Sequence, residues 1–148
     1  MNSKNIATFN PDLPIHMTFE EHDWHLLVQH WYPIALARDI TDQPTATMLL
    51  DMPLVIYKMG ENLIVAKDAC PHRGVPLSLG KNDGQGVVCR YHGLRFGEKG
   101  HCNRIPAHPE QKISERFNLK TYAAVERYGL IWCSLTAAKD TEPSIPVM

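Results

Sequence analysis

The chain lacks any long hydrophobic run. Its 148 residues contain no apolar stretch that approaches the roughly 18 residues needed for a membrane-spanning helix. The first ten residues have neither the apolar segment nor the twin arginine that mark export signals. We therefore expect a cytoplasmic protein with no membrane partner.

The chain also lacks a strong charge of either sign. It has 15 Lys and Arg against 16 Asp and Glu, which gives a formal net charge of −1. Domains that bind nucleic acids through their charge are usually strongly basic. The overall balance therefore predicts no nucleic-acid partner.

Cysteine is scarce, with four in the whole chain. A domain of this length buries roughly 70% of its unfolded surface, so it can stabilise a core without disulfides. Cysteines in the reducing cytosol stay as thiols unless they bind metal or perform redox chemistry. Cys102 and Cys133 are predicted to be such ordinary reduced thiols.

The N-terminal part predicts a lead-in followed by one short helix. Residues 1–17 are polar and interrupted by Pro11 and Pro14. Thr18, followed three residues later by Glu21, forms the pattern of a capping box. We therefore expect a helix that begins at Thr18 and ends near residue 30.

The pattern changes at Trp31 to short β-prone runs separated by Gly, Pro, Asn and Asp. Many short strands with tight turns favour an all-β antiparallel sandwich or small barrel over a parallel α/β sheet. The predicted organisation is a lead-in and helix over 1–30, one β domain over 31–136 and a tail over 137–148. The expected strands are 31–36, 45–50, 54–58, 63–67, 87–89, 94–96, 118–125 and 130–135.

Two short Cys/His motifs carry the chemistry. Cys70 and His72 are separated by one residue, and Cys89 and His92 by two. Structural zinc sites usually pair cysteine with cysteine and histidine with histidine, which fits this spacing poorly. A Rieske [2Fe–2S] centre, in which two cysteines hold one iron and two histidines the other, fits it well. A zinc site and unrelated buried side chains remain the alternatives.

The residues around the two motifs resemble the cluster loops of Rieske proteins, at 70–76 and 89–94 here. The likeness extends to the N-terminal Rieske domain of ring-hydroxylating and demethylating terminal oxygenases, in the branch of vanillate demethylase and phthalate dioxygenase. It implies a small antiparallel β-sandwich or barrel, with a cluster-binding subdomain of two hairpin loops and one cluster per chain. The segments that carry it are 30–35, 76–80, 91–97, 105–107 and 125–132.

The resemblance also implies roles for the four residues. Cys70 and Cys89 would hold the inner iron, and His72 and His92 the outer, more exposed iron. The electron donor would be a reductase or a ferredoxin. The acceptor would be an oxygenase catalytic domain or subunit, reached through His92.

Four further positions imply a low reduction potential. High-potential Rieske proteins have a disulfide between their loops, and a serine and a tyrosine that donate hydrogen bonds to sulfur. The corresponding residues here are Val75, Tyr91, Leu94 and Phe96. Fewer donors to sulfur stabilise the reduced state less, which places the potential at roughly −150 to 0 mV.

The mononuclear iron of the terminal oxygenases is held by two histidines and a carboxylate, and this chain shows no segment for it. His25 and His30 have a similar spacing, but on a helix they would point about 140° apart. His16, His22, His101 and His108 are expected at the surface, although the last two fall near the segment that would cover the cluster. We therefore expect an electron-transfer component of a monooxygenase or dioxygenase, catalytically incomplete alone. A stand-alone Rieske ferredoxin is the first alternative, and a zinc-stabilised interaction module a remote one.

Overall fold

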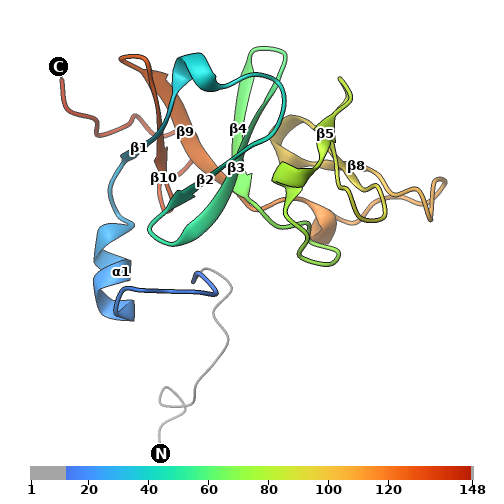
Figure 1. Ribbon diagram of the computed structural model, residues 1–148, viewed down its shortest axis with the longest axis horizontal. Coiled ribbons are helices and arrows are strands. Elements are labelled where there is room, and N and C mark those ends of the chain that lie inside the picture. Colours follow the sequence, from blue (N-terminus) through green and yellow to red (C-terminus); the bar gives the residue numbers. More distant parts are fainter. Residues whose placement is uncertain (1–12, 148) are drawn as a thin grey trace, which may run out of the picture.

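The computed structural model describes residues 13–147, which form ten strands in two antiparallel sheets and a single α-helix (Figure 1). The all-β prediction is confirmed. The larger sheet has the order β1-β10-β9-β4-β3-β2, and the smaller has the order β5-β6-β7-β8. The larger sheet contains β1 (Tyr32–Leu36), β2 (Thr45–Leu49), β3 (Met52–Met59), β4 (Asn62–Lys67), β9 (Thr121–Arg127) and β10 (Leu130–Ser134). The smaller contains β5 (Lys81–Asn82), β6 (Val87–Val88), β7 (Arg95–Phe96) and β8 (Cys102–Arg104).

The larger sheet curls into a nearly closed barrel. Its two edge strands approach each other where the Thr47 hydroxyl of β2 donates to the Ile34 carbonyl of β1 at 3.0 Å. The strand pairing is shortest between β4 and β9, where only two residue pairs are in register. Figure 1 shows the smaller sheet at the opposite end of the molecule from α1 (Glu21–Leu27) and the C-terminus.

Strand β3 is buried on both faces and separates two hydrophobic cores. Successive side chains of a strand point to opposite sides. Leu54 and Ile56 therefore fill the barrel core, while Val55 and Tyr57 fill a second core shared with the smaller sheet. All four side chains are 0% exposed. An apolar run of this kind is typical of a strand covered on both faces.

Buried polar side chains fasten the smaller sheet to the barrel. The Tyr57 hydroxyl donates to the Gly97 carbonyl at 2.8 Å. The amide of Asn82, which is 8% exposed, donates to the carbonyls of Lys58 and Asp42 at 3.0 and 2.9 Å. These bonds fix the position of the smaller sheet relative to β3.

The predicted capping box is wrong. Helix α1 begins at Glu21, and its N-cap residue Glu20 makes no side-chain cap. The backbone N–H and hydroxyl of Thr18 donate instead to the Asp51 carboxylate, at 2.6 and 2.7 Å. The Asp51 carboxylate thus accepts the Thr18 N–H that the Glu21 side chain would accept in a capping box.

The strand predictions are confirmed except at the margins. The strand expected over 118–125 begins at Thr121, and the two short strands β5 and β8 were not predicted. Neither strand contains a β-branched or aromatic residue, the residue types that mark strands in a sequence. Within residues 13–147 the structure contains no helix long and apolar enough to cross a membrane.

Candidate metal centre

The two Cys/His segments form loops closed by the same backbone hydrogen bond. The Cys70 N–H donates to the Val75 carbonyl at 2.8 Å, and the Cys89 N–H donates to the Leu94 carbonyl at 2.7 Å. Each bond joins a cysteine to the fifth residue after it. The fourth residue is glycine in both loops, with φ of 75° at Gly74 and 71° at Gly93. This left-handed conformation is one that glycine adopts without strain.

The loops differ in where they present histidine. His72 is the second residue after its cysteine, whereas His92 is the third after Cys89 and has a φ of 66°. A non-glycine residue in this region costs on the order of 1–3 kcal/mol, and such residues cluster at functional sites. Four other described non-glycine residues also have positive φ, so this conformation at His92 reflects the tight course of the second loop.

The two thiols lie together in the core between β3 and the smaller sheet. Cys70 and Cys89 are each 2% exposed and are close enough to share a hydrogen bond. Burial raises the pKa of the Cys70 thiol to about 11, and the Cys89 thiol acts in the same direction. The backbone N–H groups of His72 and Arg73 oppose this by donating to the Cys70 sulfur. Only a strong positive charge, such as a metal ion, can keep such buried thiols deprotonated near neutral pH.

The two imidazoles lie together on the solvent side. The ring centroids of His72 and His92 are 5.2 Å apart at an interplanar angle of 73°, and both residues are exposed. The residue Tyr91 is 49% exposed, and its ring centroid lies 3.9 Å from the ring centroid of His92. The site therefore has a buried sulfur pair and an exposed nitrogen pair.

This two-and-two arrangement suits a binuclear group better than a single ion. Among residues 13–147, no group of three or more His, Cys, Asp or Glu side chains is arranged around one metal position. A structural zinc ion takes four ligands around one point. A Rieske cluster takes two thiolates on one iron and two imidazoles on the other, so the donor set fits it.

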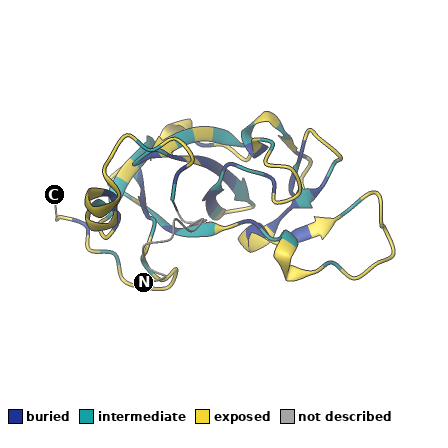
Figure 2. Cartoon of the chain, turned by 90° about the horizontal axis from the view of Figure 1, so that it is seen from below, coloured by how far each residue is buried: buried dark blue, intermediate teal, exposed yellow. Residues whose placement is uncertain are grey.

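A pocket of about 870 Å³ opens beside the two imidazoles. Its other wall is the segment 105–117, which follows β8 and is largely exposed (Figure 2). His108 lines this pocket, as its sequence position suggested.

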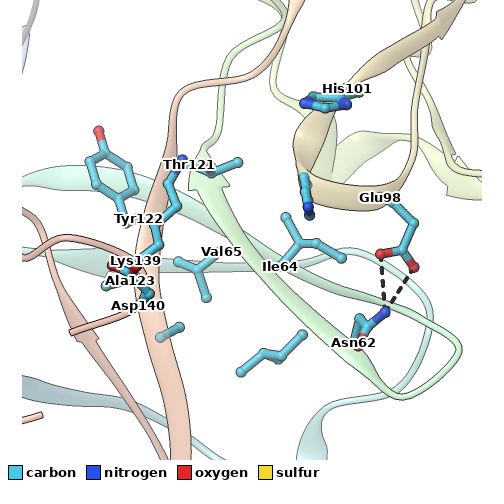
Figure 3. Close-up of a pocket in the computed structure, with 13 residues that line it drawn as sticks. Asn62, Ile64, Val65, Glu98, His101, Thr121, Tyr122, Ala123, Lys139 and Asp140 are labelled. Carbon is cyan, nitrogen blue, oxygen red and sulfur yellow. Dashed lines mark hydrogen bonds between the residues drawn. The ribbon is translucent and has the colours of Figure 1, made fainter. Parts of the chain in front are cut away.

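His101 instead lines a separate pocket of about 590 Å³ between β4 and β9, drawn in Figure 3. There Asn62 donates to both oxygens of Glu98, at 3.1 and 3.2 Å. None of the residues that line this pocket belongs to the two loops. It is therefore distinct from the candidate centre.

The remaining histidines and cysteines lie outside the centre. His16, His22, His25 and His30 are exposed, as expected for surface residues. Cys102 and Cys133 are buried free thiols, which confirms their prediction. Burial raises the pKa of Cys133 to about 12.

One hydrogen-bonded pair beneath the first loop was missed by sequence reasoning. Asp68, two residues before Cys70, is 8% exposed. Its carboxylate accepts the Ser78 N–H at 2.8 Å and the Ser78 hydroxyl at 2.5 Å. The pair closes the base of the first loop from 68 to 78. No local signal could reveal it, because the two residues are ten positions apart.

Two of the four positions proposed to lower the potential, Leu94 and Phe96, are apolar and buried. Leu94 is 2% exposed and Phe96 is 0% exposed. Neither carries a hydroxyl that could donate to sulfur. The donors that reach the Cys70 sulfur are backbone N–H groups of its own loop.

Comparison with known proteins gives a consistent picture. The family described as Rieske [2Fe-2S] domain matches residues 30–123. The chain is 33% identical over 116 residues to the methylxanthine N1-demethylase NdmA of Pseudomonas putida, covering 74% of this chain and 33% of the relative. It is 39% identical over 104 residues to the vanillate O-demethylase oxygenase subunit of a Pseudomonas species, covering 69% and 28%. The chain thus spans about a third or less of the length of these relatives.

Solved structures agree with these relatives. A crystal structure of dicamba monooxygenase superimposes with a TM-score of 0.73 at 32% identity, covering 81% of this chain and 39% of that one. A structure of NdmA superimposes with a TM-score of 0.70 at 32% identity, covering 78% and 36%.

Proposed function

Because the chain belongs to the Rieske [2Fe-2S] domain family, which implies a Rieske-type [2Fe–2S] cluster, we propose that it transfers single electrons within an oxygenase system. It is homologous to the Rieske domains of oxygenases. The observation that carries the proposal is the matched pair of loops, which bring two buried thiols and two exposed imidazoles to one place. A bound cluster of this type supplies reversible one-electron redox chemistry.

We assign Cys70 and Cys89 to the inner iron and His72 and His92 to the outer iron. Burial supports this division, since both cysteines are 2% exposed while both histidines face solvent. The apolar side chains of Leu77, Leu94 and Phe96, each no more than 2% exposed, exclude water from the sulfur side. The imidazoles then offer the shortest route for an electron between the centre and the surface.

The donor in this proposal is a reductase or a ferredoxin, and the acceptor is a mononuclear non-haem iron site on another domain or chain. This proposal is supported by relatives that are named as oxygenase components, such as the vanillate O-demethylase oxygenase subunit and the dicamba O-demethylase oxygenase component. His92 is the proposed exit point, because its ring lies at the surface beside that of Tyr91. A cytoplasmic location stays a prediction.

The first experiment is anaerobic purification after expression in iron-replete medium. A [2Fe–2S] centre predicts a brown protein with two iron and two sulfide per chain, and the EPR signal of a Rieske centre after reduction. A colourless protein with stoichiometric zinc would instead establish the zinc module.

The ligand assignment is tested by His92→Cys. A thiolate in place of a neutral imidazole adds negative charge to the cluster and lowers its reduction potential. His108→Cys is the matched control, because His108 lines the same pocket without belonging to either loop. If wild type and His92→Cys have the same reduction potential, His92 is not a ligand of the cluster.

A further inference from the structure

The small net charge of the chain hides a strong internal asymmetry. Residues 69–117 contain eight Lys and Arg against four Asp and Glu, a net charge of +4. The rest of the chain contains seven Lys and Arg against twelve Asp and Glu, a net charge of −5. The positive segment is the one that forms both loops and the smaller sheet, at one end of the molecule (Figure 1).

The positive charge concentrates around the exposed imidazoles. The pocket beside His72 and His92 is lined by Arg73, Lys112 and Arg116, and no carboxylate lines it. All three cationic residues are exposed. We call these three residues the cationic rim.

Among the described residues, none of the three rim side chains forms an ion pair with a carboxylate. Arg95 is the cation of the smaller sheet that pairs with a carboxylate, at 3.2 Å from Asp83, and it is outside the pocket lining. Glu110 and Glu115 belong to the same segment as the rim, but they do not line the pocket. The guanidinium of Arg116 lies 5.0 Å from the centre of the Phe117 ring, which holds its charge in place.

We propose that the cationic rim is the docking surface for the electron donor, and that the donor presents an acidic patch to it. This inference rests on the proposed function, in which the donor and then the acceptor use the imidazole side in turn, since docking here matters only if electrons enter through the imidazoles. Exposed like charges around a redox centre favour a transient complex, because they accelerate encounter more than they strengthen binding.

The asymmetry also predicts how the donor approaches. A protein with +4 at one end and −5 elsewhere orients an acidic partner toward the positive end and repels it from the rest. Such steering raises association rates by roughly 10–1000-fold at low salt and disappears as salt screens the charges.

The test is the rate at which the cluster-loaded protein is reduced by two small donors of opposite charge. The methyl viologen radical is a cation, and the sulfonatopropyl viologen radical is an anion. In each reaction one viologen radical loses an electron and the centre gains it. The anionic donor is expected to react more slowly as salt is added, and the cationic donor more rapidly.

The rim variant is Lys112→Glu with Arg116→Glu, which leaves Arg73 intact because it directly follows the assigned ligand His72. It is expected to slow the anionic donor on the order of tenfold at low salt. The matched control is Arg38→Glu with Lys139→Glu, the same change in charge at two exposed residues outside the positive segment. The control is expected to match wild type within about twofold. If charge reversal prevents folding, Lys112→Gln with Arg116→Gln gives a smaller change in the same direction.

Competition then separates a protein partner from a small anion. Poly-L-glutamate is expected to block reduction of wild type by the anionic viologen at matched ionic strength, and to leave the rim variant unaffected. Inorganic pyrophosphate blocking equally well would make the pocket a small-anion site and overturn the docking proposal.

The remaining outcomes are also decisive. A cluster-loaded protein whose rates are the same with both viologens and in both variants would refute the docking surface alone. A protein without a cluster would overturn the proposed function and this inference together.

Discussion

The clamp between Asp68 and Ser78 should control how firmly the first loop holds its cluster. Ser78→Ala removes the hydroxyl that donates to the Asp68 carboxylate at 2.5 Å. The backbone N–H of residue 78 still donates to the other carboxylate oxygen, so one of the two bonds survives. The lost bond is charge-assisted and its acceptor is 8% exposed, so its removal costs about 2 kcal/mol.

This loss of free energy predicts a faster loss of the cluster. If the cluster leaves through local opening of the first loop, a loss of about 2 kcal/mol increases the open population about thirtyfold. The assay is the decay of visible absorbance after a strong iron chelator is added to the loaded protein. Ser78→Ala is expected to lose its colour up to about thirtyfold faster than wild type.

The control for this experiment is Thr41→Ala. Its hydroxyl also takes part in one hydrogen bond, as the acceptor of the Gln43 N–H at 3.1 Å, but it is exposed and lies in the loop before β2. Exposed substitutions of this kind usually change stability by less than about 0.5 kcal/mol. A decay rate in Ser78→Ala within twofold of Thr41→Ala would refute the clamp.

Three further variants test other parts of the structure. Tyr57→Phe removes the buried bond to Gly97, whose carbonyl keeps its bond from Gly100, so about 1 kcal/mol is lost and thermal unfolding shifts down by about 2–4 °C. Gly93→Ala forces a side chain into a φ of 71° and is expected to reduce cluster occupancy, measured as iron per chain. Hydrogen bonds from Thr18 lower the pKa of Asp51 below 3.8, so its stabilising contribution is present above that pH and lost as the pH falls through the lowered value. Asp51→Asn should therefore flatten the acid limb of the stability curve, and an unchanged acid limb would contradict the assignment.

The sequence predicts local features of the site and misses its long-range supports. The spacing within 70–72 and 89–92 was sufficient to propose the ligand set, because each motif folds as one short loop. The partners of Asp68 and Tyr57 lie 10 and 40 positions away, where no local pattern reaches. The capping box failed for the same reason, since Asp51 is 33 residues from Thr18.

The charge asymmetry shows a different limit. Its residues are all visible in the sequence, yet a net charge of −1 averages the two ends to almost nothing. Only the fold shows that the positive residues share one end with the imidazoles. Charged residues counted for each segment, once the fold is known, therefore reveal an asymmetry that the net charge of the whole chain does not.

Strand β3 sets a limit on how this protein can be divided. Its alternate side chains complete two cores, so the barrel forms one wall of the compartment that contains Cys70 and Cys89. A transplant of residues 69–117 into another scaffold would leave that compartment open to water on one side. Exchange of electron-carrying modules between related proteins must therefore include the whole barrel, with junctions placed before Tyr32 and after Ser134.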